Sequence, residues 1–195
     1  MEKVLLIVTV LLGVGVVVGF GALFMFTGSS KKDLTYTHLN PNFSISFPEG
    51  YERGLADGET VARFELANDN RIPNFSIRVY DPPNILGATP DLILSRLPGE
   101  YSDMLKSIYP TISDMSITEN QVINLSDGYK AIAWKLKWKW TDEVTYLQSA
   151  AVAGIKDNKV VTCFGTDLFS EDKSADPILN QCKKLMFNAP QKAAK

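Results

Sequence analysis

The sequence FSISFPEGY occupies residues 43–51. Phe43, Ile45 and Phe47 alternate with two serines, which is the period of a β-strand that buries one face. The residues just before, Asn40-Pro41-Asn42, are typical of a turn, and Pro48-Glu49-Gly50 is typical of the end of a strand. The stretch therefore predicts a half-buried strand near the beginning of a sheet.

The same alternation recurs further along the chain and predicts more strands. The longest covers residues 132–140, where lysines at 135, 137 and 139 alternate with a face made of Ile132, Trp134, Leu136, Trp138 and Trp140. Other strands are expected at residues 61–67, 75–80, 117–125, 144–155 and 160–166. Turn residues at 126–128, 141–142 and 157–158 separate the last four strands, which indicates an antiparallel meander.

Two segments have helical spacing instead. Thr89 is a suitable N-cap, with Pro90 at the first helical position and Asp91 complementing the helix dipole. Pro98-Gly99 is expected to break or kink this helix, and Pro110 to close it. A last helix is expected from Asp176-Pro177, with an apolar face made of Ile178, Cys182, Leu185 and Met186. Strands followed by strands, with two helical blocks, predict an α+β fold in which helices cover an antiparallel sheet.

The N-terminus has a different composition. Residues 4–26 contain one polar side chain, Thr9, and would span about 35 Å as a helix, enough to cross a bilayer. A cleaved signal peptide is the alternative, but its apolar region is shorter and ends at a better small-residue site. We therefore expect an uncleaved anchor at 1–27, a juncture at 28–33, one domain at 34–188 and a polar tail at 189–195. The short leading tail favours a cytoplasmic N-terminus and a domain on the outer, extracellular or periplasmic side.

Small residues cluster within this apolar segment. Gly15 and Gly19 form a GxxxG pattern, and Ala22 extends the same helical face. Such a face allows a second membrane helix to approach closely, although one GxxxG also arises easily by chance. The expected partners are thus the lipid bilayer, through residues 4–26, and another membrane protein.

Composition excludes several classes of function. The chain has 20 basic and 22 acidic residues, which leaves no basic excess for nucleic acid. A single histidine, His38, rules out a multi-histidine metal site and disfavours a Ser/His/Asp triad. No phosphate-binding or metalloprotease motif occurs, and no nucleophile and base pair can be named. We expect no enzyme activity and no cofactor.

The two cysteines are 19 positions apart. Cys163 falls in the last expected strand and Cys182 on the apolar face of the last helix. A helix that packs back on its own sheet could bring them within disulfide distance. Two buried free thiols are the alternative. A lone pair on a domain outside the cytoplasm favours the disulfide.

The tryptophan-rich strand has two interpretations. Most simply, its aromatic face packs beneath a helix. Trp138 and Trp140, however, approach a turn, and their edges beside Lys137 and Lys139 could form an exposed aromatic and cationic patch for a protein partner or lipid headgroups.

Several of these features resemble PsbP-like domains. The FSISFPEGY stretch is similar to the opening motif of that family, and Gly128 with Tyr129-Lys130-Ala131, the long hairpin and a closing helix ending at Met186-Phe187 match its layout. The superfamily includes PsbP, the Ran-binding Mog protein and DcrB-like envelope proteins. The resemblance covers residues 34–188. It implies an α/β/α sandwich around an antiparallel sheet and a binding or accessory role at membranes or protein complexes.

Two functions follow as hypotheses. The leading one is a non-enzymatic, membrane-anchored accessory or assembly subunit of a membrane protein complex. The alternative is an envelope ligand-binding protein with a pocket between sheet and helices. An exposed aromatic surface would favour the first, and a polar-lined pocket would favour the second.

Overall fold

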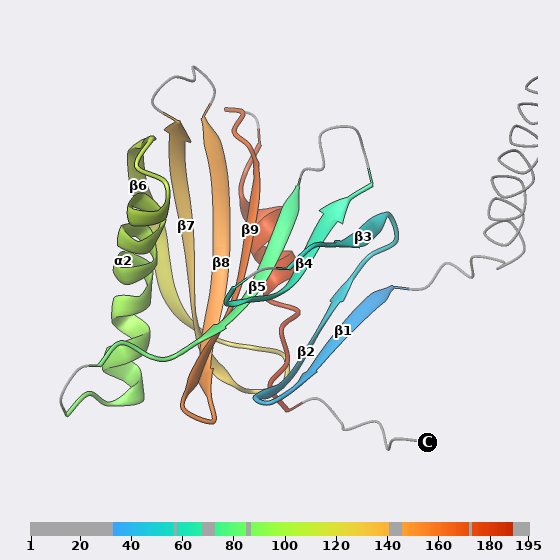
Figure 1. Cartoon of the computed structure of the whole chain (residues 1–195), viewed down its shortest axis with the longest axis vertical. Coiled ribbons are helices and arrows are strands. Elements are labelled where there is room, and N and C mark those ends of the chain that lie inside the picture. The colour runs from blue at the N-terminus through green and yellow to red at the C-terminus, as the bar shows by residue number, and fades with distance from the viewer. Residues whose placement is uncertain are drawn as a thin grey trace, which may run out of the picture. The chain divides into compact units, whose positions relative to one another are not determined.

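The structure is a computed structural model that describes residues 33–56, 58–67, 73–84, 87–140, 146–171 and 173–188 (Figure 1). The chain divides into two units, Met1–Lys32 and Asp33–Lys195. The expected anchor, with Gly15, Gly19 and Ala22, lies outside the described residues, as does the tail at 189–195. Among the helices that are described, none is both long and apolar enough to cross a membrane.

Most strands of the described chain belong to one antiparallel sheet. Its order is β3-β4-β5-β9-β8-β7-β6, and β1 and β2 form a separate hairpin. The strands are β1 (Leu34–Leu39), β2 (Asn42–Phe47), β3 (Tyr51–Gly54), β4 (Thr60–Leu66), β5 (Asn74–Tyr80), β6 (Ile112–Asn124), β7 (Lys130–Trp140), β8 (Leu147–Lys156) and β9 (Lys159–Leu168). The helices are α2 (Pro90–Ile108) and α3 (Asp176–Cys182).

The sheet carries a layer on each side. Helix α2 packs on β6, β7 and β8, while α3 packs on the opposite side of β7, β8 and β9 (Figure 1). The β1–β2 hairpin shares the α3 side, since its aromatic residues join the same apolar cluster as α3. We call the side with α3 and the hairpin the closed face, and the side with α2 the cleft face. This arrangement confirms the expected antiparallel sheet with two helices.

Alternation along the strands explains how each side obtains its core. In β7, Ile132, Trp134, Leu136 and Trp138 are buried on the cleft face, beneath the α2 residues Leu94, Leu97, Tyr101 and Leu105. In β2, Phe43, Ile45 and Phe47 are buried on the closed face. Burying one large apolar side chain contributes roughly 1.5–3 kcal/mol, so a strand with a consistent apolar face holds its register.

Helix α2 begins as expected and is longer than expected. The side chain of Thr89 accepts a hydrogen bond from the Leu92 amide at 3.3 Å, and Pro90 follows it. Of the break or kink expected at Pro98-Gly99, the break does not occur, because one helix continues through both residues to Ile108. Pro98 removes one helical hydrogen bond, but the buried residues on either side of it pack on the sheet and keep the helix continuous.

Helix α3 is shorter than expected. It ends at Cys182, whereas the sequence had predicted a helix reaching Met186-Phe187. Beyond it, Met186 instead forms an antiparallel bridge with Ser44, with reciprocal amide-to-carbonyl hydrogen bonds of 2.8 Å. Leu185 and Phe187 are fully buried on either side of this bridge. The bridge to β2 gives the amide and carbonyl of Met186 the hydrogen bonds that a further turn of helix would otherwise have supplied.

Two short strands were not predicted. β1 adds to β2 from Leu34 to Leu39, and β3 adds to β4 from Tyr51 to Gly54. The turn at Asp157-Asn158 was predicted, and both residues have positive φ angles of 50° and 56°, as a two-residue hairpin turn requires. The other expected hairpin turn, at 141–142, lies outside the described residues.

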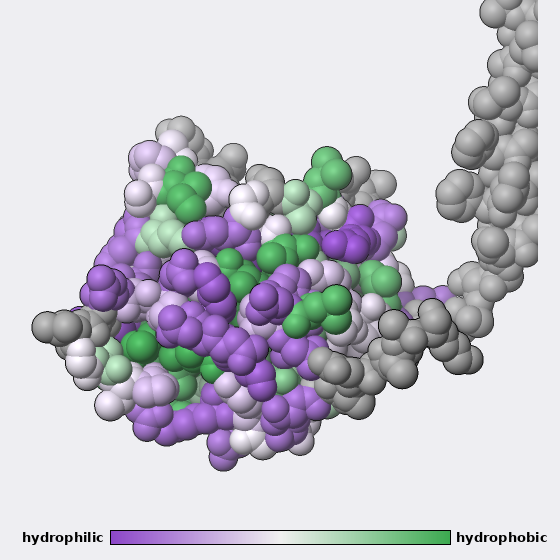
Figure 2. Space-filling model, turned by 60° about the horizontal axis from the view of Figure 1, so that its bottom comes forward, coloured by the Kyte–Doolittle hydropathy of each residue, from purple (hydrophilic) through white to green (hydrophobic). Residues whose placement is uncertain are grey.

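On the outside of the domain, apolar residues do not form one continuous area in the view of Figure 2. They occur there as small patches separated by hydrophilic residues.

Candidate functional site

A cleft of about 580 Å³ opens on the cleft face, beside the C-terminal half of α2. This volume falls within the range of pockets that bind small molecules. Its lining comes from α2, from the residues just before β4 and from five strands. The lining residues are Gly58, Glu59, Thr60, Arg63, Asn74, Ser76, Arg78, Tyr101, Leu105, Ile108, Tyr109, Trp138, Leu147, Phe164 and Thr166.

The cleft exists because α2 covers only part of its face. The helix packs on β6, β7 and β8, whereas β4 and β5 lie at the other end of the sheet. Along β5, Phe75 and Ile77 point to the closed face, so that Asn74, Ser76 and Arg78 line the cleft. The part of the floor formed by β5 is therefore polar. The part formed by Trp138, Leu147 and Phe164, like the wall formed by α2, is largely apolar.

Arg78 is the most buried cation of the cleft, with 15% of its side chain exposed. One guanidinium nitrogen, Nη2, pairs with the Glu59 carboxylate at 2.9 Å. The other, Nη1, donates to the Met104 sulfur at 3.2 Å, and a thioether is a weak acceptor. The buried Nε has no hydrogen-bond partner within the described structure. A side-chain hydrogen bond also links Arg78 to Tyr101, so that Nε is the guanidinium nitrogen left without a partner in the described structure.

Arg63 differs in its surroundings. Its Nε lies 2.7 Å from the carboxylate of Glu65, which has 10% of its side chain exposed, while 48% of the Arg63 side chain is exposed. The charge of Arg63 is therefore matched by an adjacent, well-fixed carboxylate. Of the two cleft arginines, Arg78 is the more buried, and it is the one with a buried nitrogen that lacks a partner in the described structure.

Tyr101 lines the cleft, and Tyr80 packs in the same apolar cluster on the cleft face. Complete burial raises the pKa of the Tyr101 phenol far above its ordinary value, while the Arg78 charge and side-chain hydrogen bonds with Arg78 and Ser76 act in the opposite direction. Burial also raises the pKa of Tyr80, whose hydroxyl lies 3.1 Å from that of Thr162. Both phenols are neutral at physiological pH, so they add hydrogen-bonding groups to this region without adding charge.

A row of hydroxyls crosses the floor beneath the cleft. The indole N–H of Trp138 donates to Ser149 Oγ at 2.9 Å, and Ser149 Oγ lies 3.0 Å from Thr166 Oγ1. Because an indole nitrogen can only donate, Ser149 is the acceptor in the first bond. This chain fixes the orientation of the Thr166 hydroxyl, which lines the cleft.

The expected patch around Trp138 has a different composition. Trp138 is 6% exposed, packs beneath α2 and lines the cleft, so that it is largely buried at the expected patch. The side chain of Trp140 lies outside the described part of the structure. On the closed face, the Lys137 ammonium lies 3.9 Å from the Phe169 ring centroid and 4.4 Å from that of Tyr146.

Lys139 belongs to the same group, because its ammonium lies 3.2 Å from the Asp114 carboxylate and 5.3 Å from the Tyr146 ring centroid. Both lysines are therefore engaged within the domain. The sequence missed Tyr146 and Phe169 because they lie near other strand ends, and only the pairing of β7, β8 and β9 brings them beside the lysines.

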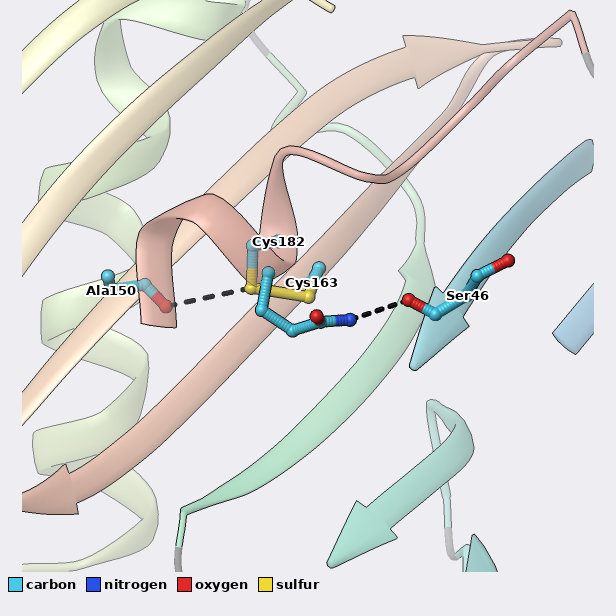
Figure 3. Close-up of a disulfide and its surroundings, with 5 residues drawn as sticks. Ser46, Ala150, Cys163 and Cys182 are labelled. Carbon is cyan, nitrogen blue, oxygen red and sulfur yellow. Dashed lines mark hydrogen bonds between the residues drawn. A yellow bond between two sulfur atoms is a disulfide. The ribbon is translucent and has the colours of Figure 1, made fainter. Parts of the chain in front are cut away.

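Cys163 and Cys182 form the expected disulfide, with a Cα–Cα distance of 5.4 Å (Figure 3). Both are fully buried, and the bond joins β9 to α3 on the closed face. Beside it, the Gln181 side-chain amide donates to the Ser46 carbonyl at 2.6 Å, which ties α3 to the hairpin. The disulfide thus fastens the layer opposite the cleft.

His38 packs against neighbouring residues and is not among the residues that line the cleft. His38 stacks on Phe43 with ring centroids 5.0 Å apart, and its Nδ1 lies 3.0 Å from the Pro41 carbonyl oxygen. The described residues contain no group of three or more His, Cys, Asp or Glu side chains placed to hold a metal ion. The sequence did not predict Glu59, Asn74 or Arg78 as site residues. Its one relevant signal was the polar side of β5, which alternation alone assigns to solvent.

Comparison with known proteins supports the fold. No protein-family model and no curated protein matches the sequence. The structure is similar to the solution structure of cyanobacterial PsbP (CyanoP) from Synechocystis sp. PCC 6803, with a TM-score of 0.63, 11% identity and coverage of 82% of this chain and 94% of that chain.

A weaker similarity, with a TM-score of 0.41 and 11% identity, relates 82% of this chain to 86% of LpqN, a protein involved in cell envelope biogenesis of Mycobacterium tuberculosis. The likeness to CyanoP extends over nearly all of that protein, and the domain therefore has a PsbP-like fold.

Proposed function

We propose that this chain is a non-enzymatic, membrane-anchored binding protein whose domain lies outside the cytoplasm and holds a ligand in the cleft beside α2. The observation that carries the proposal is the cleft itself, where a partly satisfied arginine and a polar floor face an apolar helix wall. Pockets of this kind, mostly apolar with a few directed polar groups, are typical of ligand sites. The burial of Trp138 removes the main argument for an aromatic docking surface.

The proposed location rests on two features. The apolar run at 4–26 is long enough to cross a bilayer. The Cys163–Cys182 disulfide is the kind of bond that persists in oxidising compartments. A membrane-impermeant thiol reagent applied to intact cells should label neither cysteine without a reductant. Labelling of both after lysis, still without reductant, would place the domain in the cytoplasm.

The proposal of binding without catalysis rests on the ionisable groups that line the cleft. They are Glu59, Arg63, Arg78, Tyr101 and Tyr109, and the carboxylates nearest the arginines are engaged in ion pairs. This set can orient a ligand through charge and hydrogen bonds. It offers no activated nucleophile beside a free base, which is the arrangement that group transfer needs.

The cleft is tested by filling it. Ser76→Phe places an aromatic ring on the cleft floor, and Ser95→Phe makes the same change on the exposed side of α2. The full chain, purified from its native membrane in mild detergent, should carry a small molecule that native mass spectrometry detects. We expect Ser76→Phe to lose this added mass and Ser95→Phe to keep it. Equal retention by both variants would contradict binding in the cleft.

A second candidate is an accessory or assembly subunit of a membrane protein complex, and the Gly15, Gly19 and Ala22 pattern favours it. Gly15→Leu combined with Gly19→Leu should leave the chain in the membrane, because leucine is more favourable there than glycine. Loss of a co-purifying membrane protein in this variant, with the cleft ligand retained, would support a partner bound through the helix. Unchanged co-purification would leave the helix as a tether.

A further inference from the structure

The cleft has two chemically different walls. Arg63, Asn74, Ser76, Arg78 and Thr166 supply polar groups from the strands. Leu105 and Ile108 supply apolar side chains from α2. Trp138, Leu147 and Phe164 add apolar side chains from β7, β8 and β9, where Phe164 is the register partner of Ser76. A ligand that satisfies both walls needs a polar group at one end and an apolar body at the other.

The apolar wall continues outward to the rim. Ile108 is 49% exposed and Tyr109 is 46% exposed, at the point where α2 ends. Both residues line the cleft. An apolar body seated along this wall would cover surface that the domain alone leaves in water, and burial of apolar surface favours binding.

The two arginines of the polar wall differ in how far their positive charges are already paired. Arg63 already has the well-fixed Glu65 carboxylate beside it. Arg78 has a buried Nε without a partner in the described structure, a sulfur as the acceptor for Nη1, and a Glu59 carboxylate that is 55% exposed. A buried guanidinium is stabilised when acceptor oxygens satisfy its donors, and carboxylates match its planar geometry.

The charge of the acceptor is limited by Glu59. Its carboxylate already lies against Nη2 of Arg78, so a ligand with two negative charges would meet repulsion at short range. A single negative charge suits one partly satisfied cation. Ser76, Asn74 and Thr166, on the same wall, can donate further hydrogen bonds to the same group.

From these observations we infer that the cleft selects amphipathic monoanions, with a carboxylate held at Arg78 and an apolar body along the α2 wall. The inference rests on the proposed function and names the ligand class of that same site. Arg78 is the group that distinguishes the acid from an uncharged molecule of equal shape. Glu59 competes with the ligand for the same guanidinium.

The test compares an acid with its neutral analogue. The probes are 4-phenylbutyrate and 4-phenylbutanol, titrated by calorimetry into the full chain in lipid nanodiscs, with empty nanodiscs as the blank. We expect the acid to bind at least about ten-fold more tightly, since a hydrogen-bonded ion pair is worth that much or more. In Arg78→Gln, acid affinity should fall about ten-fold while alcohol affinity is unchanged.

Two further variants sharpen the result. Arg53→Gln makes the same change at an exposed arginine over the Tyr36 ring, in the closed-face layer, and should alter neither affinity. Glu59→Gln removes the competing carboxylate and should tighten binding of the acid about three-fold, with no effect on the alcohol. This variant tests the inference even if Arg78→Gln fails to fold, because Glu59 is half exposed.

The outcomes separate the two proposals. Equal affinity for acid and alcohol, or no response of the acid to either Arg78→Gln or Glu59→Gln, overturns the selection of monoanions. If Ser76→Phe still abolishes that equal binding, the cleft remains the binding site. Binding of neither probe overturns the inference as well, and retention of the native ligand by Ser76→Phe would then also overturn the proposed function.

Discussion

The two faces of the sheet are covered to different extents. On the closed face, α3, the hairpin and the disulfide cover the strands, and Phe43, Phe47, Phe64 and Phe75 are all buried. On the cleft face, α2 covers one half of the sheet and leaves β4 and β5 beside an open, polar-floored cleft. The closed face holds the domain together, and the cleft face is where it can receive a ligand.

This contrast places stability and function in separate layers. The closed face has close aromatic packing, such as Phe47 and Phe64 with ring centroids 4.1 Å apart. The cleft face contains a partly satisfied arginine, Arg78. The described core residues of the closed face include no arginine. A buried polar group without a full set of partners lowers the free energy of unfolding. The domain can tolerate this loss on the cleft face because packing on the closed face contributes stability.

The largest expected effect tests the closed face directly. Phe47→Ala removes a fully buried ring that contacts Phe64, Phe75 and Tyr51, and should lower the free energy of unfolding by about 3–5 kcal/mol. Leu147→Ala, on the cleft wall, should cost less than about 2 kcal/mol, because that side chain already borders open space. Urea denaturation of the fragment from Asp33 onward, which we expect to fold alone, measures both. Equal losses would remove the distinction between the faces.

The disulfide comes next. Replacing Cys163 and Cys182 together by alanine should destabilise the fragment by about 2–4 kcal/mol, since the bond closes a loop with a sequence separation of 19. Amide hydrogen exchange should rise most in α3 and the hairpin, which Gln181 joins, and least in α2. Faster exchange in α2 than in α3 would show that the two layers are not independent.

A smaller effect comes from adding one methyl group at two glycines. In Gly165→Ala, on the closed face, the new Cβ would overlap Ile178 and the Phe75 ring, with an expected cost of about 1–3 kcal/mol. In Gly99→Ala, on the outer side of α2, nothing lies within 4 Å, and helix propensity should add about 0.5–1 kcal/mol of stability. Melting temperatures measure both, and a shift of the same sign would refute the assigned packing.

The smallest effect concerns pH. Lys135 lies 2.8 Å from Asp176 and 2.6 Å from Glu119 on the closed face, and the hydrogen bond from Lys135 lowers the pKa of Asp176 below its ordinary 3.8. Because the folded pKa is the lower one, this stability is complete above pH 5 and is lost as pH falls through the folded pKa.

The contribution of this ion pair should stay below about 1 kcal/mol, because the Asp176 side chain is 56% exposed. In Asp176→Asn, the urea concentration at the unfolding midpoint should change less between pH 5 and pH 3 than it does in the unchanged protein. Asp91→Asn removes an ion pair of Lys130 beside α2 and serves as the matched control. An unchanged pH profile in Asp176→Asn would contradict the role of Lys135.

Local patterns in the sequence were sufficient for features that depend on neighbours in the chain. The apolar faces of β2 and β7, the Thr89 cap and the Asp157-Asn158 turn all follow from spacing within a few residues. The disulfide needed one further assumption, that α3 packs back on its own strand, and the structure confirms it. These features predicted the fold class and the main sheet.

Features that depend on distant pairing were missed. β1 has a half-buried face made of Leu34, Tyr36 and His38. This segment is a strand because it pairs with β2. The cleft depends on β5 lying beside β9, about 85 residues later, and on α2 packing mainly on β6, β7 and β8. No pattern within β5 states whether its polar side faces bulk water or a cleft.

The bridge between Ser44 and Met186 has a consequence for how the domain is made. It joins a residue of the second strand to one close to the end of the domain, with reciprocal 2.8 Å hydrogen bonds. Chains are synthesised from the N-terminus, so the hairpin is produced first and its partner last. Until residue 186 has emerged, the aromatic side of the hairpin lacks part of its cover, so we expect the nascent chain to be more prone to aggregation than the complete chain.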